Sequence, residues 1–416
     1  MSSWTQGMSQ WWLRDVSCNS FVQAASVGWL VGTVLLIAGK PEGMGLMYAL
    51  ALISIWAAGA LQLIRLRAQE GLLLIPGARE HYLRQLAVVL SLSSVVTLLV
   101  PAVFYPAALN TLLLSISLAA VFLLYATQTP RLFYASFFLY FLLVFIDDVV
   151  SLLPNWMPSL ILIVSLVILW RHLSRPDALK WHPAASSITV SGAEMGWMWI
   201  PGVTDNSLVI RLSHKLFPLS FFSGPMLGSF LMTLGLVALL LGWFLPVVDI
   251  KFPVEFVLLQ GAGITCMLVH WTRVLRLRSQ DTLLALPVFD GRRGLMEAMF
   301  HSQLWLLLLL AINSLLVVSL IGLVYGFNWF SLVQLILLQT AGCALSLAVG
   351  SLCSRPVHLT WLMLYLIIYS ALGGILFRMS LEDALPALWI GWQILALVLA
   401  LLALKWASGK SVVSAA

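Results

Sequence analysis

Charged residues are scarce in this sequence. Only 9% of its 416 residues are Asp, Glu, Lys or Arg, whereas a typical soluble domain has about 25%. A chain with so little charge and 61% hydrophobic residues is neither a water-soluble globular protein nor a disordered one. The net charge of +6 is spread along the whole length without a dense basic patch, so nucleic acid is not expected as a partner.

Cysteine and clustered metal ligands are also lacking. The chain has four cysteines, and two of them, Cys266 and Cys343, lie within apolar runs, so no disulfide framework is implied. The seven histidines form no His-x-x-x-His pattern and no Cys/His cluster, so we expect no metal site. No clustered His, Asp and Glu constellation is present, and we expect no catalytic residues in this chain.

Long apolar runs are what the sequence has in abundance. About 20 apolar residues cross a bilayer core that is about 30 Å thick. Twelve runs of this kind predict an all-α polytopic membrane protein, and they are 20–38, 44–64, 86–104, 107–126, 133–151, 157–171, 225–247, 253–274, 300–324, 329–352, 357–377 and 384–405.

The basic residues predict how the chain is oriented. With twelve spans, both termini lie on one side of the membrane, together with nineteen of the 22 basic residues. The other side holds only Lys40, Lys251 and Arg378. Because cytoplasmic loops carry the excess of Lys and Arg, both termini are expected in the cytoplasm, and the protein is expected in a bacterial inner membrane.

One segment of the sequence occurs twice. Residues 65–76 read RLRAQEGLLLIP and residues 276–287 read RLRSQDTLLALP, with seven of the twelve positions identical. The match includes arginine, glutamine and proline in register, which apolar composition alone does not produce. The chain is therefore expected to be a 6+6 tandem repeat. Its parts are a first six-span half at 1–172, a cytoplasmic linker at 173–204 and a second six-span half at 205–416.

The repeated segments lie in two long cytoplasmic loops, around 65–85 and 276–297. Each loop opens with basic residues, passes an acidic residue and a leucine pair, and breaks at Pro76 or Pro287. This order predicts a short transverse helix with two interpretations. It is either an interfacial helix with arginines reaching the headgroups, or a docking element for a soluble partner that is used once per half.

The pattern of an acidic residue, Gly or Thr, a leucine pair and a proline at this position resembles the ABC type-2 exporter permease family. In this chain the two copies are 70–76 (EGLLLIP) and 281–287 (DTLLALP). Each copy is shorter than in many members and has only one of the Gly and Thr of the family pattern. The resemblance implies six spans per half, an amphipathic elbow helix before each first span and a cytoplasmic coupling helix after each second span.

Further features are assigned by that resemblance. The elbow helices would be residues 9–20 and 206–220, which interleave apolar and basic residues. The residues implied in coupling to an ATPase are Arg67, Gln69, Glu70, Pro76, Arg278, Gln280, Asp281 and Pro287. The acidic residues between the last two spans of each half are candidates for an outer gate, and they are Asp147, Asp148, Glu382 and Asp383. Acids at this depth are read either as functional sites or as polar residues of an outer loop.

A transporter of this family needs ATP hydrolysis on another chain. The tail contains Gly409-Lys410-Ser411, but the upstream glycine of a phosphate-binding loop is replaced by Leu404. We therefore expect no cofactor in this chain and a cytoplasmic ABC ATPase as partner, in two copies, which carries the ATP and Mg²⁺. Additional subunits of an export complex are further possible partners, and the cargo would be lipid-like, amphiphilic or a peptide.

Two other classes are compatible with the sequence. A secondary transporter of the major facilitator kind, driven by an ion gradient, also has twelve spans in two halves. Asp290-Gly291-Arg292-Arg293 partly matches the loop motif of that fold, whereas the first-half loop has no such match. A polytopic membrane enzyme is the third class, and the lack of a clustered catalytic constellation argues against it.

Overall fold

The structure is a computed structural model and describes most of the chain. The described residues are 7–14, 16–69, 75–186, 188–189, 207–224, 226–247, 254–276, 280–285, 287–325, 329–381 and 388–411. Across these ranges the chain is mostly helical and contains no strand. The prediction of an all-α fold is confirmed.

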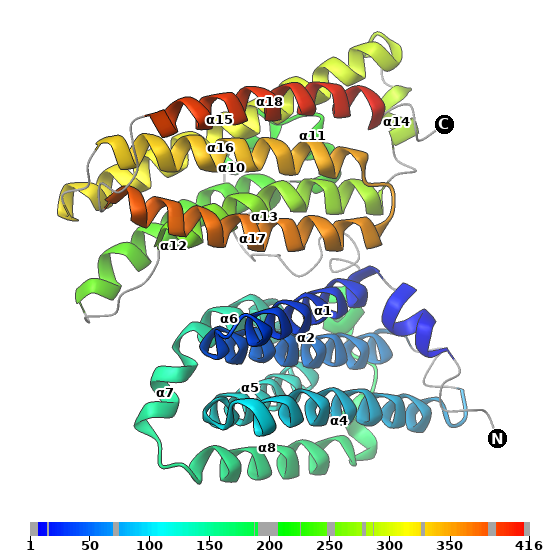
Figure 1. Ribbon diagram of the computed structural model, residues 1–416. Coiled ribbons are helices and arrows are strands. Elements are labelled where there is room, and N and C mark those ends of the chain that lie inside the picture. The colour runs from blue at the N-terminus through cyan, green and yellow to red at the C-terminus, as the bar shows by residue number, and fades with distance from the viewer. Residues whose placement is uncertain are drawn as a thin grey trace. The chain divides into compact units, whose positions relative to one another are not determined.

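The chain divides into two compact units, Met1–Trp199 and Ile200–Ala416 (Figure 1). Each unit has its own buried apolar core. The two units are described separately below.

Unit 1 is built around one buried helix, α2 (Pro41–Ala68). Its long helices are α1 (Val16–Ile37), α2 (Pro41–Ala68), α4 (Ala78–Phe104), α5 (Leu109–Gln128) and α8 (Met157–Leu173), and a short π-helix, Gln10–Arg14, precedes α1. Helix α2 packs against α1, α4 and α5, and α5 packs against α8. Small residues allow these close approaches, since a Cβ at Gly28 would lie 2.7 Å from the Met47 carbonyl oxygen and one at Gly59 would lie 2.7 Å from Leu86 Cδ1.

The chain between α5 and α8 is not one continuous helix. It consists of short pieces, which are Pro130–Ala135, α6 (Ser136–Leu142), Leu143–Phe145 and α7 (Ile146–Leu152). Helices α7 and α8 meet at an angle of 112°, at a break that contains Pro154. The run 133–151, predicted as a single span, thus alternates between 3-10 and α-helical pieces, and the sharp bend follows it.

Unit 2 contains nine helices in its described residues. They are α10 (Ser207–Lys215), α11 (Leu219–Ser223), α12 (Met226–Val247), α13 (Val254–Leu275), α14 (Gln280–Leu284), α15 (Gly291–Tyr325), α16 (Trp329–Leu352), α17 (Pro356–Leu381) and α18 (Leu388–Ser411). Helix α16 packs against α13, α15, α17 and α18, and α13 also packs against α12 and α17. The short helix α10 packs against α12.

Eight helices within the described residues are long and apolar enough to cross a membrane. They lie at Cys18–Ile37, Gly43–Ala68, Ala78–Phe104, Pro106–Gln128, Gly291–Leu323, Trp329–Leu352, Trp361–Leu381 and Leu388–Lys410, and the bent pair of α7 and α8 makes nine if it forms one span. Helix α12 adds a shorter apolar stretch, Leu227–Leu240. The protein is thus an all-helical chain of the multi-pass membrane class, and the count of twelve spans and the 6+6 repeat stay predictions.

Candidate functional site

The described residues that lead into α4, Ile75 and Pro76, form an exposed apolar segment, called the tip of unit 1 below. Gln69 follows the last residue of α2 and is exposed, and Glu70 lies outside the described residues. From residue 75 onward the chain is described again, and Ile75 is 54% exposed beside an exposed Pro76. Gly77, with φ of +76°, turns the chain into α4, a conformation that favours glycine. The tip therefore offers an apolar residue and a proline to whatever lies beyond this end of unit 1.

The loop between α13 and α15 contains a short helix and a similar tip. The five-residue helix α14 places Leu283 in the core of unit 2, fully buried. Arg278 and the side chains of Gln280 and Asp281 lie outside the described residues. Beyond α14, Pro287 is exposed and Val288 is 71% exposed. This tip again pairs an exposed apolar residue with a proline.

An aromatic contact holds the second loop in place. The Phe289 ring stacks on the Phe217 ring, with centroids 5.8 Å apart and planes 10° apart. Phe217 lies in the connection from α10 to α11, so the loop rests on the segment that precedes α12. The Phe217–Phe289 contact thus supports the loop beside Pro287 and Val288, which are both exposed.

Arg67 lies inside unit 1 and does not present its charge at the surface. Its side chain is 7% exposed. Its guanidinium donates from Nε to the Lys180 carbonyl oxygen at 2.9 Å and from Nη1 to the Thr127 carbonyl oxygen. Thr127 is in the last turn of α5, whose final carbonyl groups have no partner within the helix. Arg67 therefore ties the end of α2 to the end of α5.

The chain that follows α8 folds under the same end of unit 1. Arg79 of α4 donates from Nη2 to the Leu173 carbonyl oxygen at 3.0 Å and to the Arg175 carbonyl oxygen at 2.6 Å. The His182 amide donates to the Arg67 carbonyl oxygen at 3.1 Å, and Leu179 is 1% exposed. The first part of the predicted linker at 173–204 is therefore packed against unit 1.

A second buried arginine has the same role in unit 2. Arg273 of α13 is 3% exposed, and its Nη2 donates to the carbonyl oxygens of Gly350, Ser351 and Cys353 at 3.0, 2.8 and 2.9 Å. These carbonyls belong to the end of α16 and the residues just beyond it. In each unit an arginine of the second long helix thus binds the carbonyl end of the fourth, where a cation also complements the helix dipole.

The opposite end of unit 1 carries the two aspartates predicted for an outer gate. Asp147 and Asp148 are both exposed in the first turn of α7. Thr111 of α5 donates from Oγ1 to Asp147 Oδ1 at 2.6 Å, so Asp147 is fixed to the neighbouring helix. Glu382 and Asp383, the corresponding prediction for unit 2, lie outside the described residues.

Unit 2 has a different ion pair that the sequence did not predict. Arg378 in the last turn of α17 donates from Nε to Glu255 Oε1 in the first turn of α13, at 3.0 Å. The Glu255 side chain is only 12% exposed, whereas that of Arg378 is 61% exposed. Arg378 is one of the three basic residues that the sequence predicts on the side of the membrane with few basic residues, and this predicted position was the available signal.

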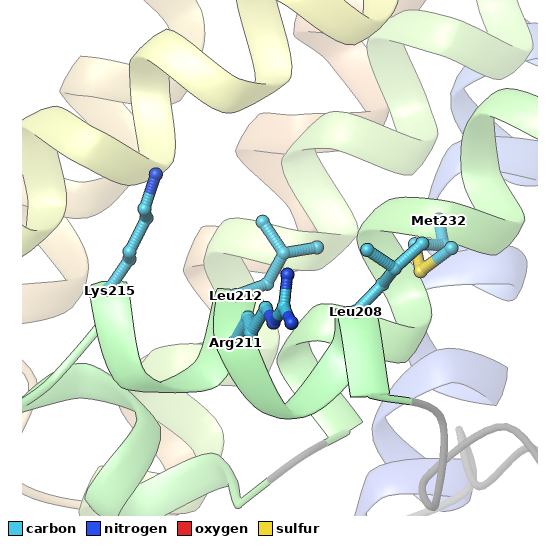
Figure 2. A pocket seen from close by; sticks show the side chains of 5 residues that line it. All are labelled: Leu208, Arg211, Leu212, Lys215 and Met232. Atoms are coloured by element: carbon cyan, nitrogen blue, oxygen red, sulfur yellow. The ribbon is translucent and has the colours of Figure 1, made fainter.

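A groove of about 310 Å³ lies beside the amphipathic helix α10. It is lined by Leu208, Arg211, Leu212 and Lys215 of α10 and by Met232 of α12 (Figure 2). The groove combines two cationic side chains with three apolar ones. Among the residues that the structure describes, no group of three or more His, Cys, Asp or Glu side chains could hold a metal ion.

Comparison with known proteins finds no matching family model, no matching curated protein and no matching solved structure.

Proposed function

We propose that this chain is the transmembrane permease subunit of an ATP-driven ABC exporter, coupled to a separate cytoplasmic ATPase. The observation that carries the proposal is the pair of exposed loop tips, Ile75-Pro76 in unit 1 and Pro287-Val288 in unit 2. Each tip follows the second long helix of its unit. An apolar residue beside a rigid proline at the end of a membrane helix suits contact with a soluble partner, since interfaces centre on a few buried apolar anchors.

The burial of Arg67 refines which side chains would make that contact. Arg67 is bound to backbone carbonyls inside unit 1, so its task in the proposal is to hold the tip-bearing helix end against α5. A docked partner that moves would then displace α2 and α5 together, because Arg67 joins their ends. Arg273 supports the same connection from α13 to α16.

The packing order of the helices also supports two related halves. In unit 1, α2 packs against α1 and α5, and α5 packs against α8. In unit 2, α13 packs against α12 and α16, and α16 packs against α18. The second, fourth and last long helices therefore have corresponding neighbours in both units. Two related halves imply two docking sites, so the ATPase would bind in two copies and carry the ATP and Mg²⁺. The cargo would be lipid-like, amphiphilic or a peptide.

Affinity purification from the native host tests this function. The tagged wild-type chain, solubilised in mild detergent, should bring down an ATPase that has a phosphate-binding loop. The double variant Ile75→Asp and Val288→Asp should recover at least about tenfold less of it, because each change places a charge in an apolar contact. Quantitative mass spectrometry of the eluates measures the ratio.

A matched double variant controls for general effects of two new charges. Leu152 is 83% exposed in unit 1 and Leu388 is 81% exposed in unit 2, and both are predicted on the opposite side of the membrane. The variant Leu152→Asp and Leu388→Asp should retain the ATPase at the wild-type level. Equal loss in both variants would contradict the role of the tips. Cargo transport in vesicles that is driven by a proton gradient alone, without any ATPase, would overturn the exporter function and favour a secondary transporter.

A further inference from the structure

The groove beside α10 has the composition of a site for an anionic amphiphile. Leu208, Arg211, Leu212 and Lys215 are spaced i, i+3, i+4 and i+7, so they form one stripe along the helix. Figure 2 shows these side chains on successive turns of α10, with Met232 beside Leu208. We propose that this groove binds the phosphate headgroup and glycerol region of an anionic phospholipid from the surrounding bilayer. This inference does not depend on the proposed exporter function.

The groove is held open by a close helix crossing. Val209 of α10 is fully buried, and a Cβ at Gly228 of α12 would lie 3.0 Å from the Val209 carbonyl oxygen. A larger residue at position 228 would make this contact tight and require the helices to move apart by a few tenths of an ångström. Because the buried face of α10 is fixed on α12, its next face, with the stripe, is presented in a constant position.

The two cationic side chains have no acidic partner among the described residues. Arg211 and Lys215 are both exposed, and neither forms an ion pair with any residue that the structure describes. Lys215 Nζ lies 5.9 Å from the centroid of the Trp305 ring of α15, a contact that orients the ammonium group without neutralising it. A phosphate between the two side chains would supply the missing negative charge, and arginine and lysine are the usual ligands of phosphate.

Trp305 indicates how deep in the membrane the groove lies. It is 47% exposed and stands where the polar beginning of α15, residues 291–303, gives way to a continuous apolar run. Tryptophan is enriched at this boundary between headgroups and hydrocarbon. Arg211 and Lys215 are among the nineteen of 22 basic residues predicted on the cytoplasmic side of the membrane. The lipid leaflet on that side is anionic.

The apolar part of the lining favours a lipid over a free anion. Leu208 is 52% exposed, and together with Leu212 and Met232 it gives the groove an apolar lining beside the two charged side chains. Inorganic phosphate or a nucleotide would leave this apolar surface uncovered. A phospholipid would cover it with its glycerol and the first carbons of its acyl chains, while its phosphate meets the basic side chains.

Native mass spectrometry of the purified full-length chain tests the proposal. The protein, delipidated in detergent, is titrated with phosphatidylglycerol or with phosphatidylethanolamine. The wild type should bind a first phosphatidylglycerol molecule more tightly than any further phosphatidylglycerol molecules. The variant Arg211→Gln and Lys215→Gln should bind that molecule about thirtyfold more weakly, since each basic side chain near an anionic lipid contributes roughly fivefold. Retention of phosphatidylethanolamine should change little.

A matched variant and a filled groove complete the test. Arg171 and Arg175 are also exposed, basic and four residues apart, so Arg171→Gln with Arg175→Gln should leave the tight site unchanged. Met232→Trp should weaken the same site without changing charge, and its melting temperature reports whether it folds. Unchanged binding in the Arg211 and Lys215 variant would overturn the proposal. Displacement of the tight lipid by millimolar inorganic phosphate would also overturn it, in favour of a soluble anion.

Discussion

Arg273 is the clearest case in which a single side chain stabilises the packing of two helices. Its guanidinium is buried and donates to three carbonyl oxygens, those of Gly350 and Ser351 in the last turn of α16 and that of Cys353 just beyond it. The Gly350 carbonyl oxygen also accepts from the Cys353 amide at 3.1 Å, so removing the side chain would leave the Ser351 and Cys353 carbonyl oxygens without this donor, which costs more than the hydrogen bonds themselves contribute.

Substitution of Arg273 by Met should therefore lower the stability of the protein by about 3 kcal/mol. Arg273→Lys should have an intermediate effect, because the ammonium group keeps the charge but cannot match the planar reach of the guanidinium. Arg293→Met is the control: this arginine is exposed, and its loss should change stability by less than about 0.5 kcal/mol. Thermal unfolding of the detergent-solubilised variants gives the comparison. Equal melting temperatures for the Arg273 and Arg293 variants would contradict the stabilising role.

The two buried arginines also mark a limit of sequence reasoning at this scale. In the repeated segments Arg67 is aligned with Arg278, yet the residue of unit 2 that binds the carbonyls of its fourth long helix is Arg273, five residues earlier. The repeat predicts that basic residues follow each second span. It does not predict which of them turns inward, because that choice depends on where the end of a helix distant in sequence lies.

At the scale of helices, hydropathy predicted which segments are helical better than where they end. The run 86–104 belongs to α4, which begins at Ala78, and the run 300–324 belongs to α15, which begins at Gly291. Both helices continue through polar residues such as Glu80 and Glu297, where hydrogen bonding and propensity persist although transfer into lipid is no longer favourable. The elbow helix predicted at 206–220 corresponds to α10 and the start of α11. The elbow helix predicted at 9–20 corresponds to the short π-helix and the first turn of α1.

Gly342 lets α16 and α17 approach closely. The Tyr369 ring of α17 lies against the Gly342 backbone of α16, in space that a Cβ would occupy. The Tyr369 hydroxyl donates to the Leu338 carbonyl oxygen, and the Tyr365 hydroxyl donates to the Gly342 carbonyl oxygen at 3.4 Å. Two tyrosines of α17 thus contact the backbone of α16 around Gly342, which has no side chain.

Gly342→Ala should displace the Tyr369 ring and destabilise the protein by about 1–3 kcal/mol, the usual cost of overpacking. Adding Tyr369→Leu should recover part of this loss, because the smaller side chain can move away from the new methyl group. Gly391→Ala in α18 is the control, since a Cβ there meets nothing within 4 Å and alanine favours a helix. Thermal unfolding of the single and double variants provides the cycle. Strictly additive effects at positions 342 and 369 would show that the two residues do not interact.

At the scale of the whole molecule, the distribution of charge predicts on which side of the membrane each exposed tip lies. The tips Ile75-Pro76 and Pro287-Val288 are adjacent to the arginine-rich ends of α2 and α13. Lys40 directly precedes α2, and Leu388 is the first residue of α18. Both lie at helix ends that have few basic residues. If the basic residues face the cytoplasm, both tips must lie there and both other positions must lie outside.

Single-cysteine labelling tests this arrangement in intact cells. The four native cysteines are buried, so a cysteine introduced at an exposed position should dominate the reaction with a membrane-impermeant maleimide. Lys40→Cys and Leu388→Cys should be labelled from outside, whereas Ile75→Cys and Val288→Cys should be labelled only after the membrane is permeabilised. Units with the same orientation require that positions 75 and 288 behave alike and that positions 40 and 388 behave alike. Labelling of Ile75→Cys and Val288→Cys from opposite sides would mean that the two units are inverted relative to one another, and a pair of cytoplasmic docking sites would then be impossible.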